Sequence, residues 1–287
     1  MRGDFHLHTT ASDGKLSPSD LVALAARNGL QIIAITDHDS TEGLAEAIAA
    51  AGPLGLQLIP GIEMSSDLGL NEVHILGLFI EHEDPELQRA LAQMRVDRED
   101  RGYRMVQNLG ALGYALDWER VLAIAAGGAV GRPHVAEAML ERGYVASVQD
   151  AFDRFLGRDG PAYAERPKLL TTDAVAFVQR FGGLAVVAHP FDGPQDLETL
   201  LADLKPAGLV GLESYYGTYT AEQVQSLVAT AGRFDLIPTG GSDFHGFERE
   251  VGVAPGTFPY PEKAVERLLQ AARERGRFPI APGSAVR

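Results

Sequence analysis

The sequence predicts an α/β protein whose strands form a parallel sheet, either closed into a barrel or covered by helices on both faces. Two observations support this fold class. Seven short apolar segments alternate with amphipathic helical segments, and most of the apolar segments lack the two-residue alternation of a half-exposed strand. A length of 287 residues suits one large α/β domain or a barrel with an insertion. The predicted strands are Asp4–His8, Gln31–Thr36, Gln57–Ile62, Val73–Phe79, Leu184–Ala188, Leu209–Ser214 and Leu236–Thr239.

Helix boundaries can be predicted at three places between these strands. Ser17-Pro18 indicates a helix start, because a serine side chain can cap free N–H groups and proline is tolerated in the first turn. Gly29 follows the last turn of that helix. Thr172 opens a second helix that ends near Gly182, and Pro261–Arg275 forms a third with basic residues in its last turn.

The alternation of strands and helices breaks between about Pro85 and Lys168. This stretch is typical of helices without intervening strands. We therefore expect residues 86–167 to form an inserted helical subdomain, and residues 1–85 with 168–287 to form the barrel domain. The helices predicted within the insertion are Glu86–Leu112, Trp118–Ala126, His134–Arg142 and Val148–Leu156.

Composition and charge restrict the class of protein and its partners. Hydrophobic residues make up 45% of the chain, as in an ordinary core, and no apolar run reaches the roughly 18 residues that span a bilayer. Cysteine is absent, which excludes disulfides and thiolate metal sites and fits a cytoplasmic protein. A net charge of −14 argues against binding of long nucleic acid, but it allows a small anionic substrate in a local positive pocket. The oligomeric state is left open.

Histidines and acidic residues gather at the ends of the predicted strands. His6 and His8 lie two residues apart in the first strand, so their side chains face the same way. The carboxyl ends of the strands form the active-site face of βα barrels, and six of the eight histidines lie at or near such ends. One core histidine is more often a packing residue than a ligand, but six in this pattern indicate a metal site. The candidate ligands are His6, His8, Asp13, His38, Glu63, His74, His189, Asp243 and His245.

Nine candidate ligands are too many for one ion. The sequence therefore predicts a site for two or three divalent ions, with Glu63 as a bridging carboxylate. Imidazole and carboxylate ligands without thiolate suit Mn²⁺, Zn²⁺ or Fe²⁺. Three such ions together with three carboxylates would leave a charge of roughly +3, which suits a phosphoryl group. Asp37 and Asp39 are expected to cap backbone groups or to orient ligating imidazoles.

Basic residues in the insertion are candidates for binding substrate. Four arginines recur at steps of three, and on a helix they either pair with nearby acids in solvent or contact a phosphate. Arg101 and Arg104 are the preferred contacts in this group of Arg95, Arg98, Arg101 and Arg104.

The segment GRPH at residues 131–134 predicts a helix start, with Arg132 and His134 near free N–H groups that attract phosphate. His134 is predicted to contact a substrate phosphate or to act as a general acid, the alternative being a capping or surface role. Arg166 and Lys168, at the end of the insertion, could complete a phosphate pocket.

The strand-end motifs resemble those of the polymerase and histidinol phosphatase (PHP) family: His-x-His at residues 6–8, Thr-Asp-His at 36–38, Glu63, His-Pro at 189–190 and Ser-Asp-x-His at 242–245. The resemblance implies a distorted seven-stranded (βα)7 barrel with three metal sites. Several branches of the family carry histidine where this chain has Asp13, and the carboxylate favours a harder ion such as Mn²⁺. The implied sites are His6, His8, Glu63 and Asp243; Glu63, His74 and His189; and Asp13, His38 and His245.

The arginine-rich helix and the GRPH segment make the chain similar to the stand-alone phosphoesterases of this family. These include nucleoside 3′,5′-bisphosphate phosphatases, some of which also trim short RNA or DNA from the 5′ end. The resemblance implies a metal-dependent phosphoric monoester hydrolase that converts adenosine 3′,5′-bisphosphate, or a similar nucleotide, to AMP and phosphate by attack of a metal-activated water. Alternatives are a 5′→3′ exonuclease on short oligonucleotides, a histidinol phosphatase and a non-catalytic interaction domain. An amidohydrolase could use similar metals, but its substrate would not need the basic helix to bind a phosphate.

Overall fold

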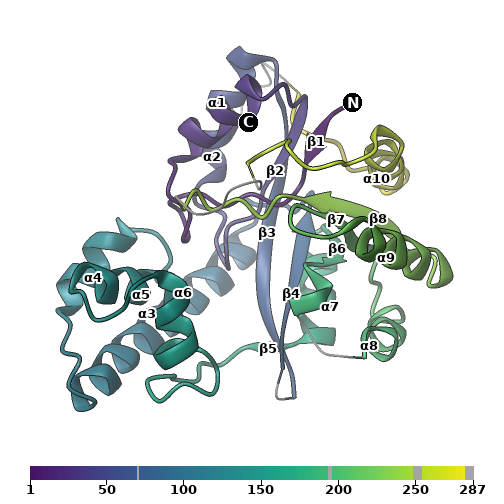
Figure 1. Ribbon diagram of the computed structural model, residues 1–287. Helices are drawn as coiled ribbons and strands as arrows, with labels where there is room; N and C mark the ends of the chain where they lie inside the picture. The colour runs from purple at the N-terminus through teal and green to yellow at the C-terminus, as the bar shows by residue number, and fades with distance from the viewer. Residues whose placement is uncertain (70, 193–195, 248–253, 282–287) are drawn as a thin grey trace.

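The computed structural model describes residues 1–69, 71–192, 196–247 and 254–281, and it consists of a barrel-like sheet with a helical lobe beside it (Figure 1). The lobe lies on one side of the long strands β3 and β4, and β7, β8 and α9 lie on the other. The strands are β1 (Gly3–Asp4), β2 (Ile32–Ile35), β3 (Gln57–Leu68), β4 (Asn71–Leu78), β5 (Leu169–Leu170), β6 (Leu184–Val187), β7 (Gly211–Tyr216) and β8 (Ile237–Gly241).

Seven of these strands form a nearly closed barrel, as the sequence predicts. They follow one another in the order β1-β2-β3-β4-β6-β7-β8, and β5 pairs with β3 outside this row. The two ends of the row meet where the Phe5 N–H donates to the Gly240 carbonyl at 3.1 Å. The Asp243 N–H donates to the His6 carbonyl at 2.9 Å, so the contact continues beyond β8.

The prediction of a wholly parallel sheet is wrong at β4. This strand begins three residues after β3 ends, without an intervening helix, and it runs antiparallel to both β3 and β6. The predicted third strand ends at Ile62, whereas β3 continues to Leu68. The second half of β3 is polar, which is typical of a loop, but its Ser65 accepts a hydrogen bond from Arg98 and its Asp67 one from Lys168. Arg98 of the lobe and Lys168, directly after the lobe, therefore stabilise a polar strand that periodicity alone does not reveal.

The other predicted strands differ from the observed ones mainly at their ends. Regular pairing with β2 covers Gly3 and Asp4, so it includes only Asp4 of the predicted first strand, because the chain then pairs irregularly with residues 240–244. β5 has two residues and is too short to leave a periodic signal, so it was not predicted. Boundaries of β2, β4, β6, β7 and β8 agree with the prediction to within two residues.

Helices cover the outside of the barrel. α1 begins where the sequence predicts, and the Ser17 hydroxyl accepts a hydrogen bond from the Asp20 N–H as its cap. Apolar residues of α7, α8 and α9 pack with those of β3, β4 and β6 in the largest hydrophobic cluster. The helices around the barrel are α1 (Pro18–Arg27), α2 (Leu44–Ala51), α7 (Thr171–Arg180), α8 (Leu197–Leu204), α9 (Ala221–Arg233) and α10 (Glu262–Glu274). Short 3-10 turns lie at Gly52–Leu54 and Pro190–Asp192.

The lobe between β4 and β5 is helical, as predicted. Leu87 and Leu91, near the start of α3, pack in the barrel's hydrophobic cluster, whereas Met105 and Leu109 pack with the other lobe helices in a cluster of their own. We therefore propose that residues 86–167 form a separate packing unit, attached to the barrel through the start of α3. Its elements are α3 (Pro85–Ala111), α4 (Trp118–Ala125), α5 (Arg132–Glu141), α6 (Val148–Ala151) and a π-helical turn at Phe152–Leu156. None of the described helices is long and apolar enough to cross a membrane.

Candidate metal centre

The structure brings the nine predicted ligands together at one end of the barrel, around Glu63. This carboxylate is fully buried, and each of its oxygens faces a different set of imidazoles. Oε2 lies 3.1–3.2 Å from ring nitrogens of His6, His8 and His38. Oε1 lies 2.8 Å from His74 and 3.1 Å from His189. A carboxylate that bridges two metal ions is expected to have each oxygen facing a separate group of donors, as Glu63 has.

The antiparallel direction of β4 explains why His74 belongs to this cluster although it lies inside a strand. His74 pairs with Ser65, two residues beyond Glu63 on β3. Because β4 runs opposite to β3 and β6, its first half lies at the end of the barrel where those parallel strands finish. A parallel β4 would have placed the same position away from that end.

The donor atoms lie close enough together to coordinate cations. Ligand atoms of three groups lie within 4.8 Å of one another: His6, His8, Glu63 and Asp243; His38, Glu63 and His74; and His8, Asp13, His38 and His245. Buried polar atoms without partners cost free energy, and neutral imidazoles with carboxylates are good ligands for divalent metals. The residues present therefore fit divalent ions. Within the described part of the chain, seven ligand atoms are buried without a hydrogen-bond partner: His6 Nε2, His8 Nδ1 and Nε2, Asp13 Oδ1, His38 Nδ1, Glu63 Oε2 and Asp243 Oδ1.

The electrostatics of the cluster keep its carboxylates ionised. Burial opposes ionisation of Glu63, but the surrounding imidazoles, His38 foremost, hold the pKa of its carboxyl well below the usual range. The pKa values of Asp13 and Asp243 are lowered against burial in the same way. Burial lowers the pKa of His38 to about 3, so this imidazole is neutral, as a metal ligand must be.

A shell of hydrogen bonds orients the candidate ligands, and most of these bonds cannot be predicted from the sequence. Glu213 is fully buried on β7; its Oε1 lies 3.1 Å from His6 Nδ1, and its Oε2 accepts the His189 N–H at 2.8 Å. The Tyr216 hydroxyl donates to Asp243 Oδ2 at 2.7 Å. A carboxylate inside an apolar strand was the available signal for Glu213, because such a group needs a buried partner. Asp37, which was predicted to cap or orient, accepts hydrogen bonds from Thr9 and Ser12.

A cavity of about 180 Å³ opens beside the ligands, between the barrel and the lobe. Phe152 of the π-helical turn lines the lobe side together with three arginines. The barrel side is formed largely by candidate metal ligands. The cavity is lined by Asp13, His38, Ser65, Glu72, His74 and His245 of the barrel, and by Arg98, Arg101, Gly131, Arg132, Pro133 and Phe152 of the lobe.

Most of the cations around this cavity are paired. Arg98 and Arg166 both donate to Asp39 Oδ2, at 2.7 and 2.6 Å, and they lower the pKa of that carboxyl to about 2 against the effect of burial. Arg132 and Lys168 lie 3.4 and 3.3 Å from Glu72 Oε2.

Arg101 differs from the other cavity arginines. It is only 3% exposed, no carboxylate of the described residues lies within 4.0 Å of it, and its Nε has no hydrogen-bond partner among them. Burial, and next to it repulsion by the charge of Arg98, lowers the pKa of this guanidinium well below its usual value. A buried cation among other cations is unfavourable unless an anion binds beside it. Arg101 therefore marks a place for an anionic group in the cavity.

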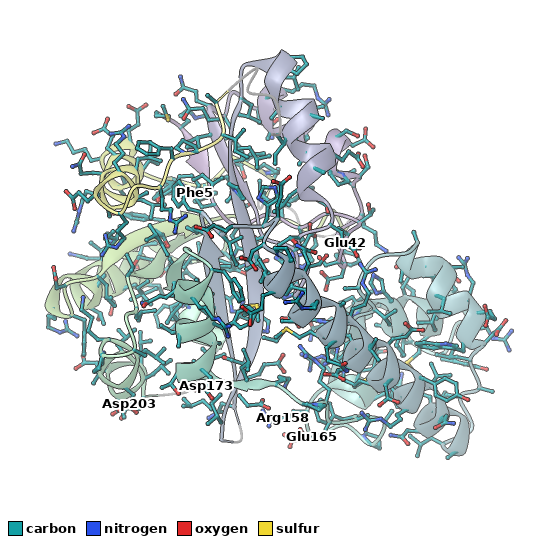
Figure 2. All side chains as sticks on the ribbon, turned by 180° about the vertical axis from the view of Figure 1, so that it is seen from behind. Phe5, Glu42, Arg158, Glu165, Asp173 and Asp203 are labelled. Carbon is teal, nitrogen blue, oxygen red and sulfur yellow. The ribbon has the colours of Figure 1, made fainter. Side chains whose placement is uncertain are left out.

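Five predicted substrate residues do not line this cavity: Arg166 and Lys168, which are described above, and Arg95, Arg104 and His134. Arg104 donates to Asp100 and to the carbonyl of Glu165, which lies near the end of the lobe and is labelled beside Arg158 in Figure 2. Arg95 pairs with Glu42. His134 is buried, its Nδ1 accepts the Gly131 N–H at 2.9 Å, and it lines a separate cavity of about 120 Å³. His134 thus caps the start of α5.

Comparison with known proteins agrees with this geometry. A 3′,5′-nucleoside bisphosphate phosphatase of Chromobacterium violaceum is 34% identical over 246 residues, which are 84% of this chain and 86% of that protein. A 5′-3′ exoribonuclease of Haemophilus influenzae is 34% identical over 245 residues, with coverage of 84% and 89%. The solved structure of a Chromobacterium violaceum protein described as an amidohydrolase, with bound sulfate and no metal, matches all of both chains with a TM-score of 0.88 and 30% identity. The PHP domain model matches residues 4–151, and the chain belongs to the PHP domain family.

Proposed function

We propose that this chain is a metal-dependent phosphoric monoester hydrolase that removes the 3′-phosphate from nucleoside 3′,5′-bisphosphates. The observation that carries this proposal is a single cavity in which the candidate metal ligands face the buried guanidinium of Arg101, which has no ion-pair partner among the described residues. A bisphosphate can place one phosphoryl group at the ligands and the other at Arg101. The name of the Chromobacterium violaceum relative supports the same substrate class. The absence of cysteine fits a cytoplasmic enzyme.

Two to three divalent ions are proposed for the three ligand groups, with Glu63 shared between them. Mn²⁺ is the favoured ion, because Asp13 supplies a hard oxygen ligand to the group that contains His38 and His245. Bound ions would supply Lewis-acid stabilisation of the phosphoryl oxygens and lower the pKa of a water molecule.

The protein's own groups hold the substrate on the lobe side. Arg101 and Arg132 line the cavity and contact the second phosphate, and Arg98 supports the cavity wall through Asp39. Arg166 supports the same carboxylate from the end of the lobe. We assign His134 a supporting role, since its hydrogen bond fixes Gly131 at the edge of the cavity.

The substrate class is tested by measuring phosphate release from matched compounds with excess Mn²⁺. We expect the kcat/KM for adenosine 3′,5′-bisphosphate to exceed that for 3′-AMP by about 10²-fold, because only the bisphosphate reaches Arg101. 5′-AMP and histidinol phosphate serve as further comparisons. Equal values for 3′-AMP and the bisphosphate would contradict a second phosphate site, and a preference for histidinol phosphate would favour that alternative activity.

Glu213→Gln should weaken metal binding without removing a ligand. Glutamine keeps the size of the side chain but loses the negative charge that faces His6 Nδ1, so His6 is less well oriented. We expect the affinity for Mn²⁺ to fall by about 10- to 100-fold, measured by competition with a chelator. Glu266→Gln, an exposed position on α10, is the matched control. Wild-type affinity in Glu213→Gln would show that Glu213 does not orient the metal ligands.

A further inference from the structure

Glu72 lines the cavity beside the candidate metal ligands but belongs to none of the three ligand groups among the described residues. It lies on β4 two residues before His74, so the two side chains point to the same face of the strand. The Glu72 side chain is 17% exposed. A carboxylate at this place repels an anionic substrate, so its charge must serve another purpose.

One carboxylate oxygen of Glu72 contacts the candidate ligand His74. Glu72 Oε1 lies 3.3 Å from His74 Nε2, and the other ring nitrogen, Nδ1, lies 2.8 Å from Glu63 Oε1. An imidazole that binds a metal ion through Nδ1 carries its proton on Nε2, and that N–H needs an acceptor. Glu72 supplies this acceptor and so fixes the ring orientation in which Nδ1 faces the ligand cluster.

The other carboxylate oxygen of Glu72 is held by two cations. Oε2 lies 3.4 Å from a guanidinium nitrogen of Arg132 and 3.3 Å from Lys168 Nζ. The Arg132 guanidinium also lies 5.6 Å from the centre of the Phe152 ring, and the Lys168 side chain is fully buried. Glu72 is therefore fixed from one side by Arg132 and Lys168, and it presents its second oxygen to His74.

The position of Glu72 in the sheet is unfavourable by itself. Glu72 pairs directly with Asp67 on the neighbouring strand β3, and like charges in such a pair destabilise a sheet. Lys168 offsets the repulsion, because its Nζ lies 2.9 Å from Asp67 Oδ1 as well as 3.3 Å from Glu72 Oε2. The contact with His74 is the interaction of Glu72 that a metal centre would use.

We propose that Glu72 is a positioning residue that strengthens metal binding by orienting His74, while its charge weakens the binding of an anion in the same cavity. The two effects have opposite signs because a carboxylate attracts the donor N–H of an imidazole and repels a phosphate. The effect on the anion rests on the proposed function, which places a phosphate beside Arg101. The effect on the metal does not.

Glu72→Gln tests both effects. Glutamine has one acceptor oxygen for three donors, and Arg132 and Lys168 compete for it with His74. We expect the affinity for Mn²⁺ to fall by about 10- to 100-fold, measured by competition with a chelator. The affinity for 5′-AMP, measured by calorimetry at Mn²⁺ concentrations that saturate each protein, should rise about fivefold because a repelling charge is removed. Structural damage would instead weaken the binding of both.

Glu72→Asp separates the contact with His74 from the charge. Aspartate keeps the negative charge, but its side chain is one methylene shorter and does not reach His74 Nε2. We expect a lower affinity for Mn²⁺ together with the wild-type affinity for 5′-AMP. Asp67→Asn is the matched control, because Asp67 binds the same Lys168 and, within the described residues, makes no ion pair with His74 or Arg132. It should keep the wild-type affinity for Mn²⁺.

Three results would overturn the proposal. Wild-type affinity for Mn²⁺ in Glu72→Asp would show that the charge acts without orienting His74. Weaker binding of 5′-AMP by Glu72→Gln would show that the carboxylate does not repel the anion. An equal loss of Mn²⁺ affinity in Asp67→Asn would attribute the effect to Lys168. The proposed function is tested on the wild-type protein by its preference for the bisphosphate over 3′-AMP, so the two proposals fail separately.

Discussion

Glu63→Gln is expected to lower kcat/KM for adenosine 3′,5′-bisphosphate by at least about 10³-fold and to reduce the number of bound metal ions. The carboxylate lies within 3.2 Å of nitrogens from five histidines, and each of its oxygens faces a different set. Glutamine has one oxygen acceptor and no charge, so it cannot bridge two cations. Metal content after gel filtration and phosphate release at saturating Mn²⁺ measure the two effects.

Chelation of the wild-type protein should produce the same loss of activity, and addition of Mn²⁺ should reverse it. The Glu63→Gln variant should not recover under the same treatment. Glu266→Gln, which changes an exposed glutamate on α10, should retain both the metal and the activity. A Glu63→Gln variant that retains wild-type metal content and turnover would contradict the bridging role. Circular dichroism of each variant excludes unfolding as the cause of a loss.

The residues that gather around Glu63 could be predicted from sequence because their signal is local. A histidine or a carboxylate at the end of an apolar strand is conspicuous within a few residues, as His38 and His189 illustrate. The supporting groups depend on contacts distant in sequence: Glu213 meets His6 across 207 residues, and Asp39 meets Arg166 across 127. Neither pairing leaves a periodic pattern, so only the fold reveals it.

The arginine stripe shows a second limit of periodicity. At 3.6 residues per turn, each step of three residues turns the side chain by roughly 60°, so Arg95 and Arg104 face opposite ways. The middle pair, Arg98 and Arg101, therefore faces the barrel and the cavity, while the outer pair binds Glu42 and Asp100. The spacing predicted a basic helix correctly. The contacts of the lobe with the barrel decide which arginines line the cavity.

Arg101→Met should weaken recognition of the substrate without lowering the stability of the protein. Methionine keeps much of the apolar bulk but removes the buried cation. We expect kcat/KM for adenosine 3′,5′-bisphosphate to fall by about 10²-fold, towards the value for 3′-AMP, because the second phosphate loses a charge-assisted contact. Without substrate, Arg101 is a buried cation near three other arginines, so its replacement should leave the thermal unfolding midpoint unchanged or raise it.

The two readouts together distinguish a binding role from a structural one. Arg89→Ala, an exposed arginine on the same helix, should change neither the substrate ratio nor the unfolding midpoint. If Arg101→Met lowers kcat/KM equally for the bisphosphate and for 3′-AMP, Arg101 supports the metal centre rather than the second phosphate. If the variant unfolds at a markedly lower temperature, Arg101 stabilises the interface between lobe and barrel. If Arg101→Met lowers kcat/KM only for the bisphosphate and does not lower the unfolding temperature, Arg101 binds the substrate. The free energy that its buried charge costs in the free protein is then offset when the anionic substrate binds.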